Sequence, residues 1–230
     1  MPTADLNGVI DLHVHAGPDV RPRKMDAVAL ALAAKAAGMR AVLLKSHHTI
    51  TADLAQIVEE VVGGIRIFGG VTLDEAGRVR DEVRRILDLV AQADVILGTC
   101  HLSPEEILIL VRTARQAGVR KVLVSHPELH GLAIPLAMQQ EMASEGAFFE
   151  RMHVHGNSVT DWSRLAEIMR AVGIERTVLV TDLGRADYAV DPIQGMGEFL
   201  DRLADQGFSQ AEIDLMARRT PARLLGLDPW

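Results

Sequence analysis

The nine histidines of the chain share one kind of position, since each ends or closely follows a short apolar run that predicts a β-strand. His13 and His15 end the first of these runs. Residues two apart on a strand project to the same face, so both imidazoles can bind one divalent cation. Asp11, two residues earlier, either orients His13 through a hydrogen bond or serves the strand structurally. The pair His13 and His15 therefore predicts a metal site at the end of this strand.

Three later polar residues occupy comparable positions. His101 and His126 follow strongly apolar runs with a similar approach, Leu-Gly-Thr-Cys before His101 and Leu-Val-Ser before His126. Asp182 ends the most hydrophobic run, residues 178–181, and a carboxylate there is costly to bury unless a metal or a proton partner compensates it. We therefore predict functional roles for all three. The adjacent Cys100 is predicted to be a small buried apolar group, because neighbours along a strand point to opposite faces.

The remaining candidates follow two other apolar runs. Residues 45–48 come after the second run, and at least one of them should face the mouth of a pocket. The sequence favours Lys45 or His47 for that place, against the alternative of a solvated loop. Glu150 ends a poorly defined run at residues 147–150. We predict that Lys45, His47 and Glu150 contact a substrate.

Apolar runs alternate with Ala- and Leu-rich helical stretches along nearly the whole chain. The runs predict seven strands, at about residues 8–13, 41–44, 65–73, 95–97, 121–125, 147–150 and 177–181. Helices are predicted between them, at about residues 26–37, 53–62, 81–93, 104–117, 135–144 and 161–172, and two more follow the last strand. Two of the helices open with capping boxes, from Ser103 to Glu106 and from Ser209 to Glu212.

Continuous apolar strands separated by helices indicate a parallel sheet that is covered on both faces. No linker, charge run or low-complexity segment interrupts the alternation, which favours one domain over residues 1–230. Seven or so strand–helix units favour an α/β barrel of the TIM type over an open sheet, with seven or eight strands and a shortened or distorted form. The carboxyl ends of barrel strands form the functional face, so one site can collect residues that are distant in sequence.

Composition and charge exclude several classes of function. The formal net charge of -7 and the aromatic content of 3% argue against a nucleic-acid partner, which needs clustered Lys and Arg or stacking rings. The single cysteine excludes a disulfide framework and a Cys-built zinc site, and it fits a reducing cytosol. No apolar run approaches the roughly 20 residues that span a bilayer, and the start of the chain lacks a signal-peptide pattern. We expect a cytoplasmic protein that acts on a small molecule, with homo-oligomerisation left open.

The segment Asp11-Leu12-His13-Val14-His15, followed in order by His101, His126 and Thr181-Asp182, resembles the amidohydrolase superfamily of metal-dependent hydrolases. The ending at residues 220–227, Thr-Pro-Ala-Arg-Leu-Leu-Gly-Leu, is similar to a C-terminal helix of that superfamily, which has Asn at the first of these positions. Within the superfamily, residues 45–48 and 181–184 look most like an uncharacterised amidohydrolase-related family.

The resemblance implies a ligand set and a reaction. The metal ligands would be His13, His15, His101, His126 and Asp182. Asp182 would also take a proton from the attacking water, and His126 would bind the metal or polarise the substrate carbonyl. Imidazoles with one carboxylate suit Zn²⁺, with Mn²⁺ as the alternative. Such a site hydrolyses an amide, lactam, lactone or ester bond in a small molecule.

Departures from the superfamily pattern keep other functions open. The residue that bridges two metals usually ends the middle strand, whereas here Lys45 ends the second, so the sequence does not decide between one metal ion and two. A PHP-type phosphoesterase resembles the chain at residues 11–15, but the Asp-His of its second motif is Ser46-His47 here and its late Asp-x-His is absent. A metal-dependent decarboxylase on the same scaffold and a non-catalytic ligand-binding barrel are the remaining alternatives.

Overall fold

The computed structural model describes residues 4–19, 22–46, 51–69, 81–100, 102–129, 133–154 and 161–227. These ranges contain seven strands: β1 (Ile10–Val14), β2 (Ala41–Leu44), β3 (Arg66–Gly69), β4 (Leu97–Gly98), β5 (Val122–Val124), β6 (Phe148–Met152) and β7 (Thr177–Val180). All paired strands are parallel, and their backbone ladders run in the orders β1-β2-β3 and β4-β5-β6-β7.

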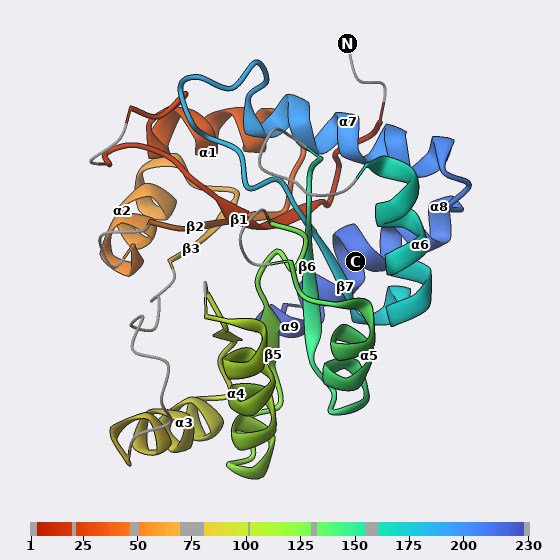
Figure 1. Ribbon diagram of the computed structural model, residues 1–230. Coiled ribbons are helices and arrows are strands. Elements are labelled where there is room, and N and C mark those ends of the chain that lie inside the picture. The colour runs from red at the N-terminus through yellow and green to blue at the C-terminus, as the bar shows by residue number, and fades with distance from the viewer. Residues whose placement is uncertain are drawn as a thin grey trace.

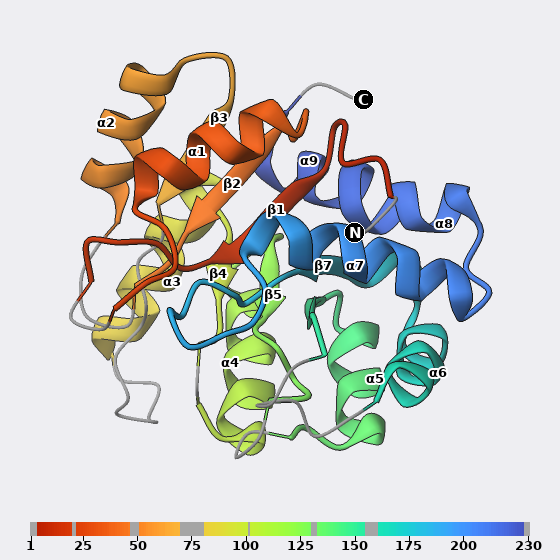
Figure 2. The same ribbon diagram turned by 90° about the horizontal axis from the view of Figure 1, so that it is seen from above.

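The two ladders meet between β1 and β7. The backbone N–H of Asp182 donates to the carbonyl oxygen of His13 at 3.0 Å, and the N–H of His15 donates to the carbonyl oxygen of Leu183 at 3.1 Å. The sheet therefore curves through the order β3-β2-β1-β7-β6-β5-β4 (Figures 1 and 2). In the ranges given above, no ladder joins β3 to β4. The predicted α/β barrel type is confirmed, with seven strands in the described part of the chain.

Helices follow the strands and surround the sheet (Figure 2). They are α1 (Ala27–Ala36), α2 (Ala52–Val62), α3 (Asp81–Ala93), α4 (Pro104–Gln116), α5 (Leu136–Ser144), α6 (Trp162–Val172), the short η1 (Ile174–Arg176), α7 (Pro192–Asp205), α8 (Gln210–Asp214), the π-helical turn η2 (Leu215–Arg219) and α9 (Thr220–Leu225). Both predicted capping boxes are present, at the starts of α4 and α8. Among these helices, none has both the length and the apolar character that a membrane crossing requires.

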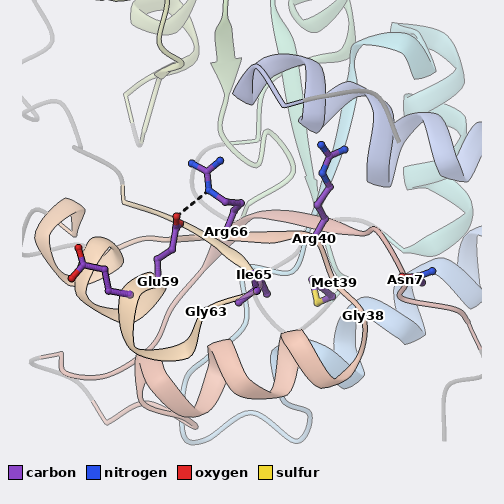
Figure 3. Close-up of a pocket in the computed structure, with 10 residues that line it drawn as sticks. Asn7, Gly38, Met39, Arg40, Glu59, Gly63, Ile65 and Arg66 are labelled. Atoms are coloured by element: carbon purple, nitrogen blue, oxygen red, sulfur yellow. Dashed lines mark hydrogen bonds and ion pairs between the residues drawn. The ribbon is translucent and has the colours of Figure 1, made fainter.

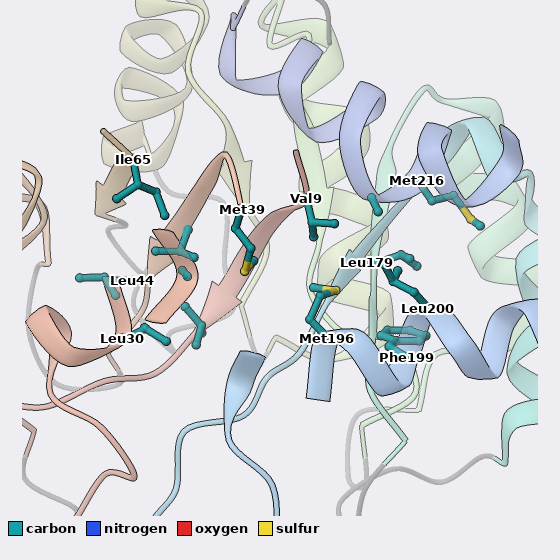
Figure 4. Close-up of a cluster of buried hydrophobic side chains, with 14 of the residues drawn as sticks. Val9, Leu30, Met39, Leu44, Ile65, Leu179, Met196, Phe199, Leu200 and Met216 are labelled. Atoms are coloured by element: carbon teal, nitrogen blue, oxygen red, sulfur yellow. The ribbon is translucent and has the colours of Figure 1, made fainter. Parts of the chain in front are cut away.

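Apolar side chains pack on both faces of the sheet. On the outer face, Val9 and Leu179 contact a cluster that includes Met39 and, from α7, Phe199 (Figure 4). On the inner face, a second cluster gathers residues of several strands and of α9, among them Ile10, Leu12, Leu123, Val178, Val180 and Leu224. This burial on two sides explains why the strands read as continuous apolar runs.

Two segments of the sheet region differ from what the sequence predicts. β6 is a five-residue strand whose residues are all buried, although Glu150 and Arg151 make the segment look weak in sequence. Their charges are paired inside the protein, so they do not interrupt the strand. Cys100, just beyond β4, is of intermediate exposure and not the buried group that strand alternation predicts. Its backbone turns to a φ of +52°, which takes it off the alternation of a regular strand.

Candidate metal centre

A buried carboxylate fixes the ring of His13. The Nδ1 atom of His13 lies 2.8 Å from Oε2 of Glu150, a residue in the middle of β6 that is 0% exposed. An ionised carboxylate only accepts hydrogen bonds, so Nδ1 carries the proton and donates it. Burial first, and then the charge of Lys45, hold the pKa of His13 well below its ordinary value, which favours the neutral ring. The Nε2 atom of His13 is therefore left with its lone pair.

A backbone carbonyl fixes His15 in the same way. The Nδ1 atom of His15 lies 2.9 Å from the carbonyl oxygen of Lys45, the residue that follows β2. A carbonyl oxygen has no proton to give, so Nδ1 is again the donor, and in the neutral form of the ring Nε2 then carries the lone pair. Two different acceptors, on β6 and after β2, thus select the same ring form in both imidazoles.

Asp182, two residues beyond β7, faces both lone pairs. Its Oδ1 atom lies 3.3 Å from Nε2 of His13 and 3.4 Å from Nε2 of His15. With neutral rings, Oδ1 faces two acceptor nitrogens, and such atoms repel unless a cation lies between them. Two ligand atoms that bind one zinc ion tetrahedrally, at about 2.0–2.1 Å each, are about 3.3 Å apart. Oδ1 of Asp182 therefore has the spacing of a shared ligand to each imidazole, and a metal ion here would be held by Asp182 with His13 or His15.

His126 lies beside this group. It is buried two residues after β5, and its ring centroid is 5.1 Å from that of His13. Ligand atoms of His13, His126 and Asp182 all lie within 4.8 Å of one another. His126 is thus placed either to join the ligand set or to act on a molecule bound next to it.

Two of the candidate site residues, each just beyond a strand, have a left-handed backbone conformation. Asp182 has a φ of +52° and His126 a φ of +24°. Such a conformation costs a non-glycine residue roughly 1–3 kcal/mol, and it persists where the surroundings hold it in place. At Asp182 the support is its own N–H, which donates to the His13 carbonyl oxygen at 3.0 Å. Strained residues concentrate at functional sites, which agrees with the chemistry of these two side chains.

Asp11 proves to serve the strands and not the imidazole of His13. Its Oδ1 accepts from the backbone N–H of His13 at 2.9 Å, and its Oδ2 accepts from the Thr181 hydroxyl at 2.7 Å. The register of β1 against β2 shifts between Asp11 and Val14, and a bulge of this kind re-aims the side chains around it. Asp11 can therefore contact Thr181 while His13 contacts Glu150.

The charge state of Asp182 depends on positive charge beside it. Burial raises the pKa of this carboxyl, whereas positive charge at His13, His15 and His126, with a hydrogen bond from His15, lowers it well below its usual range. With the neutral rings described above, a bound cation would supply that positive charge. The Asp182 side chain is 13% exposed, against 4% for His13. A molecule in the barrel mouth can therefore reach the carboxyl group of Asp182.

Glu150 and Lys45, both predicted to contact a substrate, bond to each other on the Nδ1 side of His13. The Nζ atom of Lys45 donates to Oε1 of Glu150 at 2.9 Å and lies 3.3 Å from Nδ1 of His13. Both oxygens of Glu150 are therefore bonded inside the protein, one to Lys45 and one to His13. A substrate could reach this buried carboxylate only after those bonds break, so its place is beneath the ligands.

The structure thus brings together six of the predicted site residues: His13, His15, Lys45, His126, Glu150 and Asp182. The other two, His47 and His101, lie outside the described residues. The sequence does not predict the pairing of Lys45 with Glu150, although each residue is a candidate on its own. Opposite charges at the ends of two apolar runs are the signal that could have suggested it.

An open cleft lies at the other end of the barrel (Figure 3). Its volume is about 850 Å³, and residues at the starts of β2 and β3 line it, among them Arg40, Ile65 and Arg66. The Nε atom of Arg66 donates to Glu59 at 3.1 Å, so this charge is already paired. None of the described site residues lines the cleft, and functional groups of α/β barrels gather at the opposite, carboxyl-terminal strand ends. The candidate site is therefore the cluster around Asp182.

The model of a family described as a family of unknown function (DUF6282) matches residues 8–76 and 72–150. These ranges contain His13, Lys45, His126 and Glu150. Among curated proteins, no sequence matches the chain.

Solved structures resemble the chain over nearly its whole length. An apo protein from Agrobacterium tumefaciens has a TM-score of 0.71 at 14% identity, with 100% of each chain covered. A zinc-bound amidohydrolase from Burkholderia multivorans has a TM-score of 0.64 at 13% identity, covering 96% of this chain and 99% of that one. N-acetylglucosamine-6-phosphate deacetylase from Thermotoga maritima has a TM-score of 0.64 at 12% identity, covering 96% of this chain and 78% of that one. The resemblance to the amidohydrolase superfamily is confirmed at the level of the fold.

Proposed function

We propose that this chain, which belongs to the family of unknown function DUF6282, is a metal-dependent hydrolase that cleaves an amide, lactam, lactone or ester bond in a small molecule. One observation carries the proposal: Nε2 of His13 and Nε2 of His15 face Oδ1 of Asp182 at 3.3 and 3.4 Å, with both Nδ1 atoms bonded elsewhere. Each of these two spacings matches a pair of ligands of one divalent cation, and ligand atoms of His13, His126 and Asp182 lie within 4.8 Å of one another. The zinc-bound amidohydrolase with the same fold supports zinc, with manganese as the alternative.

When bound, a divalent cation with an open coordination position lowers the pKa of water toward about 7 and polarises a carbonyl group. Asp182 would contribute in two ways, since Oδ1 faces the imidazoles and its second oxygen, Oδ2, can accept the proton of the attacking water. The same atom can return that proton to the leaving group.

The histidines divide the remaining tasks. His13 and His15 are almost fully buried, so they would hold the ion away from bulk water. His126 has its ring beside that of His13, where it would either complete the ligand set or donate a hydrogen bond to the substrate carbonyl as negative charge develops on it.

Elemental analysis of the purified protein tests the proposal first. We expect bound zinc or manganese in the wild-type protein and none in the His13→Ala/His15→Ala double variant. His153→Ala is the matched histidine control, because His153 lies against Trp162 and Glu198, with its ring 5.1 Å from that of Trp162. This variant should keep its metal. Full metal content in the double variant would show that the first-strand assignment is wrong.

A substrate panel then tests the reaction. The metal-loaded protein should hydrolyse one or more members of a set of amides, lactams, lactones and esters, and chelation of the metal should abolish that activity. Turnover of phosphoesters alone would favour the phosphoesterase alternative, and carbon dioxide release from aromatic acids would favour the decarboxylase. Metal binding without turnover of any class would favour a ligand-binding barrel.

A further inference from the structure

Lys45 has contacts that reach both metal-facing imidazoles on their Nδ1 sides. It follows β2 and stays in the sheet, because its N–H donates to the carbonyl oxygen of Val14 at 2.9 Å. Its own carbonyl oxygen accepts from Nδ1 of His15 at 2.9 Å. Its side chain extends to β6, where Nζ donates to Glu150 at 2.9 Å. Glu150 in turn accepts from Nδ1 of His13 at 2.8 Å.

We infer that Lys45 is a positioning residue that sets His13 and His15 in the ring form that binds metal, through its ammonium group for one and its carbonyl oxygen for the other. The inference rests on the metal-dependent function proposed above and assigns a task to a residue that the sequence suggested for substrate binding. Second-layer partners of this kind fix the tautomer and orientation of metal-binding histidines.

The burial of Glu150 explains why a cation is needed at this point. The carboxylate is fully buried, whereas the side chain of Lys45 is 16% exposed. An isolated carboxylate is very costly to remove from water, and a nearby ammonium with good hydrogen-bond geometry offsets that cost. Lys45 therefore offsets the cost of burying the acceptor beneath His13, and that acceptor selects the Nδ1–H form of the ring.

The direction of the ammonium group argues against a contact with substrate. Nζ lies 2.9 Å from Oε1 of Glu150 and 3.3 Å from Nδ1 of His13, so it sits on the side of the ring opposite Nε2. The metal-facing edge of His13 is the other edge, toward Asp182. Lys45 thus acts from beneath the ligands, and its effect on a bound molecule is transmitted through His13.

The two contacts of Lys45 can be separated by mutation. Lys45→Met removes the ammonium but keeps a side chain of similar length and the backbone carbonyl, so it should release His13 and leave His15 fixed. Lys45→Arg keeps the positive charge and should restore most of the effect. Lys35→Met is the matched control, since Lys35 is an exposed lysine of α1 that donates to the Val62 carbonyl oxygen at 3.1 Å.

Two measurements test the inference. Zinc affinity, measured by competition with a chromophoric chelator, should fall by about 10- to 100-fold in Lys45→Met, the usual effect of losing a second-layer partner. It should recover in Lys45→Arg and stay unchanged in Lys35→Met. Nitrogen NMR of the metal-free protein should show both His13 and His15 protonated at Nδ1 in the wild type, and loss of that form at His13 alone in Lys45→Met.

The outcomes separate this inference from the proposed function. Unchanged zinc affinity and an unchanged His13 tautomer in Lys45→Met would overturn the role of Lys45 while leaving metal-dependent hydrolysis intact. Equal disturbance of both rings would also overturn it, because that result indicates general loosening of the fold. A wild-type protein that binds no metal would contradict the proposed function, and the NMR measurement would still decide whether Lys45 sets the tautomer of His13.

Discussion

Asp11 and Thr181 are joined by two hydrogen bonds that link the first strand to the end of the last. Oδ2 of Asp11 accepts from the Thr181 hydroxyl at 2.7 Å, and Oδ1 accepts from the Thr181 N–H at 3.3 Å. Oδ1 also accepts from the N–H of His13. This clamp lies directly beneath the two chain segments that carry His13 and Asp182, so it holds the two sides of the metal centre at a fixed spacing.

The clamp predicts a pH dependence of stability. Burial raises the pKa of Asp11 from 3.8 to about 7, with the hydrogen bonds from Thr181 and His13 opposing the rise. The folded protein therefore keeps a proton that the unfolded chain releases between about pH 4 and pH 7, and stability falls as the pH rises through that range. Asp11→Asn removes this titration and retains the shape. Relative to the wild type, the variant should gain up to about 4 kcal/mol in free energy of unfolding between pH 4 and pH 7.

Urea unfolding of both metal-free proteins at several pH values measures this difference. Comparing the two proteins cancels the titration of the histidines, which is common to both. A difference that stays constant across the range would contradict the raised pKa of Asp11.

Asp182→Asn separates the proton-accepting role of Asp182 from its role as a ligand. Asparagine tolerates the left-handed backbone that this position requires, where φ is +52°. The amide cannot accept the proton of water, so turnover should fall by roughly two to four orders of magnitude. Metal content should fall less than in His13→Ala/His15→Ala, because both imidazoles remain. Kinetics on an identified substrate, with metal analysis of the same sample, make the test.

The alternative for Asp182 is a purely structural turn residue. In that case the substitution would cost only about 1 kcal/mol of stability, and turnover would stay near the wild-type value. That result would remove the proton-transfer step proposed here.

The strands, and the polar residues that follow them, could be predicted because both depend on the pattern of neighbouring residues in the sequence. Apolar runs closed by His13, His126 or Asp182 mark strands buried on two faces, and the carboxyl ends of parallel strands must meet at one end of a barrel. Capping boxes are local as well, which is why both helix starts at Ser103 and Ser209 appear as expected.

The contacts that complete the site depend on pairs far apart in sequence, and these could not be predicted. Lys45 and Glu150 are 105 positions apart, and Asp11 and Thr181 are 170 apart. Each member looks ambiguous alone, because a charged residue at a strand end is equally consistent with a solvated loop. Only the register of the sheet shows that Glu150 lies under His13.

Gly184 is expected to be irreplaceable for the geometry of β1 against the segment after β7. Its φ is +133°, and a Cβ atom added there would lie 1.9 Å from the carbonyl oxygen of His15. Because this oxygen belongs to the backbone, the clash can be relieved only by moving the strand that carries the metal ligands. Gly184→Ala should therefore lower both stability and zinc affinity. Gly63→Ala, where a Cβ would meet nothing within 4 Å, is the control for the positive φ alone.

Thermal unfolding and chelator competition on the two glycine variants give the answer. We expect Gly63→Ala to cost about 1–2 kcal/mol of stability from backbone strain with unchanged zinc affinity. Equal zinc affinity in Gly184→Ala and the wild type would show that the close approach to His15 is not needed for the site.

The ion pair of Arg151 with Glu128 should be among the most sensitive contacts of the fold. Arg151 is fully buried, and its Nη1 atom donates to Oε1 of Glu128 at 2.5 Å and to Oε1 of Gln139 at 2.7 Å. Glu128 follows His126 by two residues, so the pair ties the segment after β5 to β6. Arg151→Met leaves the Glu128 carboxylate buried without its partner, which should cost about 3–5 kcal/mol of stability.

A double variant distinguishes loss of the pair from loss of packing. Arg151→Met with Glu128→Gln removes both charges and should be more stable than Arg151→Met alone, because no isolated charge is left in the interior. Arg112→Met is the matched arginine control: its pairing with Glu141 is half-exposed, and its loss should cost less than about 1 kcal/mol. Urea unfolding of the four proteins at one pH provides the free energies. If the double variant is no more stable than the single one, the cost comes from the lost arginine side chain, and the charge of Glu128 contributes nothing to it.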